Sequence, residues 1–166
     1  KEQKVFTEGS SKAIRVNDNI TIDANKFKYD KILRILEAID NVIIKDPGKG
    51  FELRTQKVTY NINDEQIFAE GESNGILNNK YNFFSKNIFF NRLLMEITSS
   101  KKSRIVDQES TTYKLDEFMY NTKNELLKGE NIKVITNDKS KKYGTDEYFF
   151  SNSFIDLKNQ NFKSSE

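Results

Sequence analysis

Residues 20–30, with the sequence ITIDANKFKYD, decide the fold because their pattern returns about every 30 residues along the 166-residue chain. The stretch closes on an aromatic residue followed directly by a turn-forming residue. Equivalent aromatics follow at near-constant spacing: Tyr29, Tyr60, Phe90, Tyr120 and Phe150. The turn-forming residues behind them are Asp30, Asn61, Asn91, Asn121 and Ser151. Self-similarity at a fixed period indicates one supersecondary unit that is stacked several times.

Each repeat predicts a strand that bends near its middle. In the first repeat Ile22 and Ala24 share one parity, whereas Phe27 and Tyr29 share the other. The parity changes at a polar pair in every repeat: Asn25-Lys26, Gln56-Lys57, Lys86-Asn87, Asp116-Glu117 and Asp146-Glu147. An extra residue in a strand is typical of a β-bulge, where the strand bends and keeps its apolar side inward. Bulges in register predict a sheet that folds along a line into two facing halves.

The residues after each aromatic predict a tight reversal and a return strand. Asp and Asn tolerate the left-handed backbone that hairpin turns use. In the first repeat an aliphatic residue, Leu36, then stands seven positions after Tyr29, and the small Ala38 follows it. The fold class predicted is therefore all-β, a bent antiparallel β-jellyroll of about ten strands from five hairpin repeats.

The apolar residues of these alternations are predicted to line one shared interior. Recurring small residues such as Ala24 and Ala38 are expected to leave room between its walls. The candidate interior residues are Ile22, Ala24, Phe27, Tyr29, Leu36, Ala38, Leu53, Val58, Tyr60, Ile67, Phe83, Ile88, Phe90, Ile97, Leu115, Phe118, Tyr120 and Leu127.

The repeats also predict the domain organisation. Residues 1–19 lack the pattern and are expected to be a polar lead-in or linker. Residues 20–166 are expected to form a single domain. Residues 46–50, DPGKG, contain the one proline of the chain and are predicted to be a surface loop.

The composition argues against enzymatic chemistry. The chain has no cysteine and no histidine, which removes thiol nucleophiles, the usual general base and the common zinc ligands. The net charge is +2, so no nucleic-acid partner is expected. Adjacent carboxylates such as Asp116 and Glu117 point to opposite faces of a strand. We therefore expect no catalytic residues, no metal and no cofactor.

Two stretches resemble the OstA-like repeat of lipopolysaccharide-transport proteins. That pattern is an alternating strand, an Asp or Asn turn, and then Ala-x-Gly-Asn-Val. Residues 20–30 followed by 36–42, LEAIDNV, are similar to it, with Asp40 in place of the glycine. Residues 53–60, followed by Ala69-Glu70-Gly71, resemble it again. The resemblance covers roughly residues 20–163.

The resemblance implies a non-catalytic periplasmic domain that carries lipopolysaccharide through its apolar crease, in contact with the lipid A acyl chains. Other OstA-like transport proteins are the implied partners, joined end to end by pairing of edge strands. The resemblance is greatest to the periplasmic domain of an outer-membrane assembly protein. It thus implies a C-terminal outer-membrane barrel as a further partner, and a periplasmic, outer-membrane-associated location.

Two other functions fit the same repeats. The first is a structural β-repeat, such as a solenoid stalk or an adhesin-type interaction module, with a solid core and no lipid. The second is a closed barrel that binds a small ligand, which requires the first and last repeats to pair. Uptake of lipid or dye separates a groove from a solid core.

Overall fold

The computed structural model describes residues 4–17, 19–136, 145–159 and 161–164, and it confirms an all-β fold. The described part of the chain contains no helix that is long and apolar enough to cross a membrane. Its elements are β1 (Lys4–Arg15), β2 (Ile20–Asp30), β3 (Ile35–Asp46), the 3-10 turn η1 (Pro47–Lys49), β4 (Phe51–Asn61), β5 (Gln66–Leu77), β6 (Tyr81–Asn91), β7 (Glu96–Ser99), β8 (Ser103–Val106), β9 (Thr112–Leu115), β10 (Glu117–Asn121), β11 (Leu126–Ile135), β12 (Glu147–Asp156) and β13 (Asn161–Ser164).

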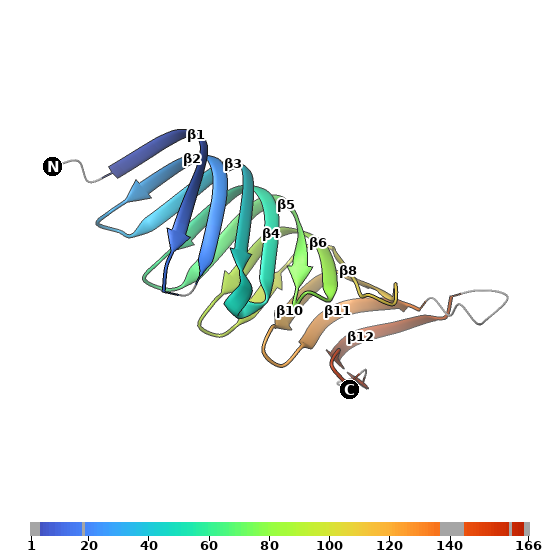
Figure 1. Cartoon of the computed structure of the whole chain (residues 1–166). Coiled ribbons are helices and arrows are strands. Elements are labelled where there is room, and N and C mark those ends of the chain that lie inside the picture. The colour runs from blue at the N-terminus through green and yellow to red at the C-terminus, as the bar shows by residue number, and fades with distance from the viewer. Residues whose placement is uncertain (1–3, 18, 137–144, 160, 165–166) are drawn as a thin grey trace.

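The strands form one antiparallel sheet in which neighbours in the chain are neighbours in space (Figure 1). β1 and β13 lie at opposite ends of the strand order, so the sheet is not closed by pairing of its first and last strands. β7 and β8 are the two halves of one strand interrupted at 100–102, and β9 and β10 are interrupted at Asp116. Because β6 pairs with both β7 and β8, and β11 with both β9 and β10, these six strands form a closed ring of pairings around the interruptions.

The sheet bends along a line of bulges that crosses the strands. Asp40 and Asn41 of β3 have positive φ angles of 66° and 54°, and together they lie opposite the single Gln56 of β4. Gly71 of β5 and Asn87 of β6 continue the line, with φ angles of 88° and 52°. Asp, Asn and Gly adopt this left-handed backbone at least cost, which explains their recurrence at the bend.

The predicted change of parity is confirmed at the first four polar pairs, but the bulged residues lie mostly on the return strands. The burial of β4, for example, changes parity between Thr55 and Val58, across Gln56-Lys57. The extra residue at this level belongs to β3 and β5. A change in the parity of the buried residues of one strand therefore indicates where the sheet bends. It does not indicate which of the paired strands contains the extra residue.

The bend divides the sheet into two facing arms. The turn arm carries the hairpin turns at 31–34, 62–65, 92–95, 122–125 and 157–159. The loop arm carries the connections between hairpins at 47–50, 78–80 and 107–111. Figure 1 shows the first four hairpin turns as a row along one side of the molecule.

The hairpin turns repeat one hydrogen-bond pattern. The Oδ1 atom of Asn91 accepts hydrogen bonds from the backbone N–H groups of Leu93 and Leu94, both at 3.1 Å. Asp30, Asn61 and Asn121 do the same in their turns. The left-handed residue is the last of each turn, Met95 in the third (φ 58°). The prediction that Asp and Asn supply the left-handed backbone here was wrong, because they act through their side-chain oxygens.

The fifth repeat is displaced from its predicted position. Phe150 is half-buried and Ser151 lies inside β12 rather than in a turn. The turn begins instead at Asp156, whose Oδ1 accepts from the N–H of Asn159 at 3.0 Å. Ile155 pairs with Leu127, as Tyr120 does in the preceding hairpin. The 30-residue spacing of the aromatics does not hold here, because Ile155 and not Phe150 takes the position that Tyr120 has in the preceding hairpin.

The predicted lead-in contains a strand. β1 pairs with β2 over most of its length, and a register shift between Glu8 and Ser11 continues the bend. Its side chains are largely exposed, so the segment lacks the apolar alternation that marks the other strands. β1 thus covers the edge that β2 would otherwise present to solvent.

Gly71 supports a direct test of the bend. Nothing lies within 4 Å of a Cβ atom added there, so replacement by alanine changes only the backbone preference at φ +88°. We expect Gly71→Ala to lower the free energy of unfolding by about 1 kcal/mol, measured by denaturant titration. Gly71→Asn is the matched control and is expected to cost less. Equal losses for both variants would contradict this account.

Candidate functional site

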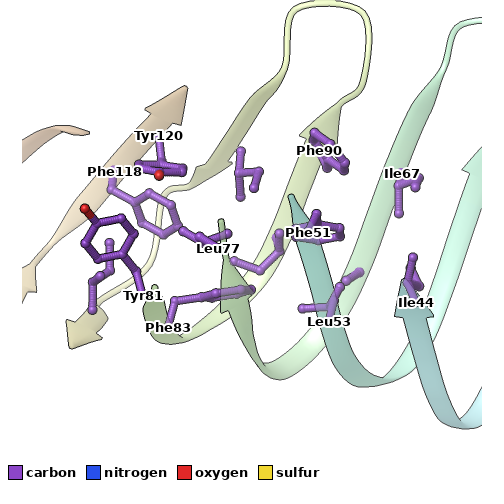
Figure 2. Packing of buried hydrophobic residues seen from close by; sticks show 14 of the residues in the cluster. Ile44, Phe51, Leu53, Ile67, Leu77, Tyr81, Phe83, Phe90, Phe118 and Tyr120 are labelled. Carbon is purple, nitrogen blue, oxygen red and sulfur yellow. The ribbon is translucent and has the colours of Figure 1, made fainter. Parts of the chain in front are cut away.

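The candidate site is the apolar interior between the two arms. Sixteen of the eighteen predicted interior residues are buried, with exposed fractions of 6% or less, and they belong to one continuous cluster. The exceptions are Tyr29 and Leu36, which are half-buried. Figure 2 shows members of the cluster pointing toward one another from the two layers of strands.

The two walls of the interior touch. The ring centroid of Phe51 on the loop arm lies 4.6 Å from that of Phe90 on the turn arm. Tyr81 and Tyr120 meet in the same way, with centroids 6.1 Å apart. Ala38, which was expected to leave room, is fully enclosed by its neighbours. The interior in this structure is therefore a packed core along these contacts.

A buried ion cluster joins the arms on the side opposite the bend. We call it the Arg92 cluster, and its members are Arg15, Asp46, Tyr60, Glu65 and Arg92. The side chain of Arg92 is 2% exposed, and its Nε donates to Oδ2 of Asp46 at 2.6 Å. Its Nη1 donates to the hydroxyl of Tyr60 at 3.0 Å and also to Glu65. Since Asp46 ends β3 on the loop arm and Arg92 lies in a hairpin turn, the cluster holds the free ends of both arms together.

β1 contributes the second cation of the cluster. Nη1 of Arg15 donates to the Tyr60 hydroxyl at 2.6 Å and to Glu65. The hydrogen bond to Glu65 raises the pKa of Arg15, and burial raises the pKa of Tyr60. Tyr60 therefore stays protonated and donates to Glu65 at 3.1 Å. The cluster is a positioned set of charges with no nucleophile that these contacts activate.

A smaller polar cluster lies further along the stack, where Glu125 stands two hairpin turns after Glu65. We call it the Glu125 cluster, and it contains Lys80, Tyr81 and Glu125. Nζ of Lys80 lies 2.9 Å from Oε1 of Glu125, and the Tyr81 hydroxyl donates to Oε2 at 3.2 Å. Nearby, Nδ2 of Asn78 donates to the carbonyl of Thr122 at 2.8 Å. Glu125 closes its hairpin turn as Glu65 does, so both clusters use the same position of the repeat.

The Glu125 cluster predicts a component of acid sensitivity. Burial alone would raise the pKa of Glu125, but the hydrogen bond and charge of Lys80, with the Tyr81 hydrogen bond, hold it below the usual 4.5. A carboxylate with a lowered pKa stabilises the fold above its unfolded-state pKa, and this contribution is lost as the pH falls through the folded-state value. We expect Glu125→Gln to lose less stability than the wild type between about pH 7 and about pH 3 in denaturant titrations. The exposed Glu117→Gln is the control, and an unchanged pH dependence of Glu125→Gln would contradict the assignment.

The interior borders a cleft near the last described hairpin. The cleft has a volume of about 470 Å³, and its lining includes Tyr81, Tyr113, Ile155 and Leu157 from the core. The Tyr113 hydroxyl lies 3.5 Å from Oδ2 of Asp107, and burial together with that carboxylate raises the pKa of Tyr113. Buried side chains of the core thus form part of the wall of this cleft, beside polar groups.

Sequence reasoning missed both ion clusters. Asp46 was assigned to a surface loop, yet it is fully buried. The available signal was a break in the repeat, because Arg92 stands where the neighbouring hairpins have Ile62 and Thr122. The charge of Arg92 between these two uncharged neighbours was the feature to follow.

Comparison with known proteins gives no further guide to the site. The chain matches no protein-family model, and no curated protein matches it as a relative. The features that bear on function are therefore the apolar interior, the Arg92 and Glu125 clusters and the ends of the sheet.

Proposed function

We propose that this chain is a non-catalytic domain that binds lipopolysaccharide through its lipid A acyl chains and passes the lipid along the interior. The observation that carries the proposal is the single apolar cluster running through the stack of hairpins, in a sheet whose terminal described strands, β1 and β13, do not pair with each other. Each methylene buried there would contribute about 0.8 kcal/mol, so one acyl chain of about a dozen methylenes would gain on the order of 10 kcal/mol.

Entry of a lipid requires the arms to separate on the side opposite the bend. The contacts that hold this side are largely ion pairs and hydrogen bonds of the Arg92 and Glu125 clusters. Charged groups regain hydration when such contacts open, which lowers the cost of separation relative to an apolar seam. The acyl chains would then replace the wall-to-wall contact of Phe51 and Phe90.

The proposal includes a periplasmic location and partners at the sheet ends. β1 and β13 are the terminal strands of the described sheet. A terminal strand presents unpaired N–H and C=O groups that a strand of another chain can pair with. Other OstA-like transport proteins, or a segment leading to an outer-membrane barrel, are the proposed partners.

The packed interior favours a second candidate, a structural β-repeat that acts as a stalk or interaction module. The observation that supports it is the contact between the two walls, where the ring centroids of Phe51 and Phe90 lie 4.6 Å apart. This candidate predicts a folded protein that takes up neither lipid nor an apolar dye.

A pair of photo-crosslinking side chains distinguishes the two candidates. Ile97 is fully buried in the interior, whereas its neighbour Thr98 lies on the outer face opposite Phe89 and Met119. With a photoreactive residue at one position or the other, the protein is illuminated in the presence of lipopolysaccharide. We expect adducts at 97 and none at 98.

The remaining outcomes are equally specific. Absence of adducts at both positions, in protein that circular dichroism shows to be folded, supports the structural β-repeat. Equal adducts at both positions mean that the lipid coats the surface, which also rejects passage through the interior.

A further inference from the structure

Two hairpin turns of the row carry pairs of large aliphatic side chains that point into solvent. Ile32 and Leu33 in the first turn are 62% and 58% exposed. Leu93 and Leu94 in the third turn are 69% and 59% exposed. Exposed pairs of this size at protruding turns are unfavourable in water unless another surface covers them.

The repeat shows that the turn itself does not require these residues. The second hairpin has Asn63 and Asp64 at the same two positions, and the fourth has Lys123 and Asn124. All four turns use the same side-chain acceptor, so polar residues satisfy the geometry equally well. The geometry of the turn therefore does not account for the aliphatic pairs.

Backbone hydrogen bonds hold the turns in one row. The N–H of Ile62 donates to the carbonyl of Arg34 at 3.1 Å, and the N–H of Arg92 donates to that of Glu65 at 2.9 Å. The first and third turns are four strand spacings apart, about 19 Å. Figure 1 shows these turns on the same side of the molecule. The two aliphatic pairs thus protrude from a single ordered edge.

The exposed charges around the pairs are mainly basic. Lys31 and Arg34 flank the first pair, and Lys123 and Lys158 are exposed in the fourth and fifth turns. Asp64 is the exposed acidic residue among the described turn residues, since Glu65 and Glu125 are half-buried in the two clusters. Protruding aliphatic side chains surrounded by basic residues are complementary to the surface of an anionic bilayer. There the apolar groups insert between the lipids, and Lys or Arg side chains contact the phosphates.

We propose that this row of turns docks on an anionic lipid bilayer, with Ile32, Leu33, Leu93 and Leu94 inserted at the boundary of headgroups and acyl chains. A fluid surface accommodates two separate protruding pairs, which do not form a groove for a helix or peptide. Docking in this way turns the side of the fold where the arms meet toward the membrane. The inference is independent of whether lipid enters the interior, which the Ile97 adducts test separately.

Vesicle binding tests the proposal. The full chain is sedimented with vesicles of phosphatidylglycerol and, in parallel, of phosphatidylcholine. We expect binding to phosphatidylglycerol, and at least tenfold weaker binding for Leu93→Asn/Leu94→Asp, which copies the residues of the second hairpin. Phe6→Asn is the matched control, because Phe6 is 63% exposed on β1 outside the row, and it is expected to bind as the wild type does.

A fluorescent residue reports the depth of insertion. The chain contains no tryptophan, so Leu94→Trp introduces a single probe at a tip and Phe149→Trp a single probe on an exposed strand position. We expect phosphatidylglycerol vesicles to shift the emission of the probe at 94 to shorter wavelength and to leave the probe at 149 unchanged. Three results overturn the proposal: no vesicle binding, undiminished binding of the double variant, or covering of the tips by self-association, seen as a concentration-dependent mass that the double variant abolishes.

Discussion

Replacing Arg92 by threonine is expected to lower the free energy of unfolding by about 3–5 kcal/mol, because it leaves the buried carboxylate of Asp46 without a cation. The side chains of Arg92 and Asp46 are 2% and 1% exposed, so water does not reach the charge that remains. Glu65 is less affected, since Arg15 still donates to it. Denaturant titration at neutral pH measures the loss.

The next hairpin of the chain supplies the control. Leu77 and Thr122 stand at the positions that Asp46 and Arg92 occupy one repeat earlier. The double variant Asp46→Leu/Arg92→Thr copies that arrangement and removes both charges, so we expect it to recover most of the lost stability. If the double variant is as unstable as Arg92→Thr alone, the loss stems from packing rather than from an unpaired charge.

Truncation of Phe90 is expected to lower the free energy of unfolding by a similar amount, about 3–5 kcal/mol for Phe90→Ala. Phe90 is fully buried, and its ring meets Phe51 on the opposite arm, so its removal opens a cavity where the walls touch. The same titration measures the effect.

Phe68→Ala is the matched control for this variant. Phe68 belongs to the neighbouring strand, but it is 40% exposed on the outer face of the sheet. We expect its replacement to cost less than about 1 kcal/mol. Comparable losses for the two variants would mean that the interior does not carry the stability of the fold.

Much of the fold could be predicted because the burial signal is local. The two-residue alternation and its change of parity at pairs such as Gln56-Lys57 follow from which face of one strand is buried. The turns could also be placed, since Asn61 and its equivalents satisfy two backbone N–H groups within their own turn. Both signals are contained in a few neighbouring residues.

The remaining features depend on residues far apart in the chain. Arg92 is buried because Asp46 lies opposite it on the other arm, and no pattern around either residue shows the pairing. β1 is a strand because its backbone pairs with the edge of β2, although most of its own side chains are exposed. The fifth hairpin was misplaced because Phe150 resembled the repeat, whereas the pairing of Ile155 with Leu127 decides the register.

The order of the strands makes the length of the interior adjustable in discrete steps. In the described sheet every hairpin pairs only with the hairpins before and after it in the chain. The last strand of each hairpin therefore presents the same kind of strand edge for pairing as the last strand of the hairpin before it. Duplication of one 30-residue unit would extend the stack by two strand spacings, about 10 Å, and would keep every register. Chains of this architecture can therefore gain or lose whole units by recombination while the surrounding units keep their contacts.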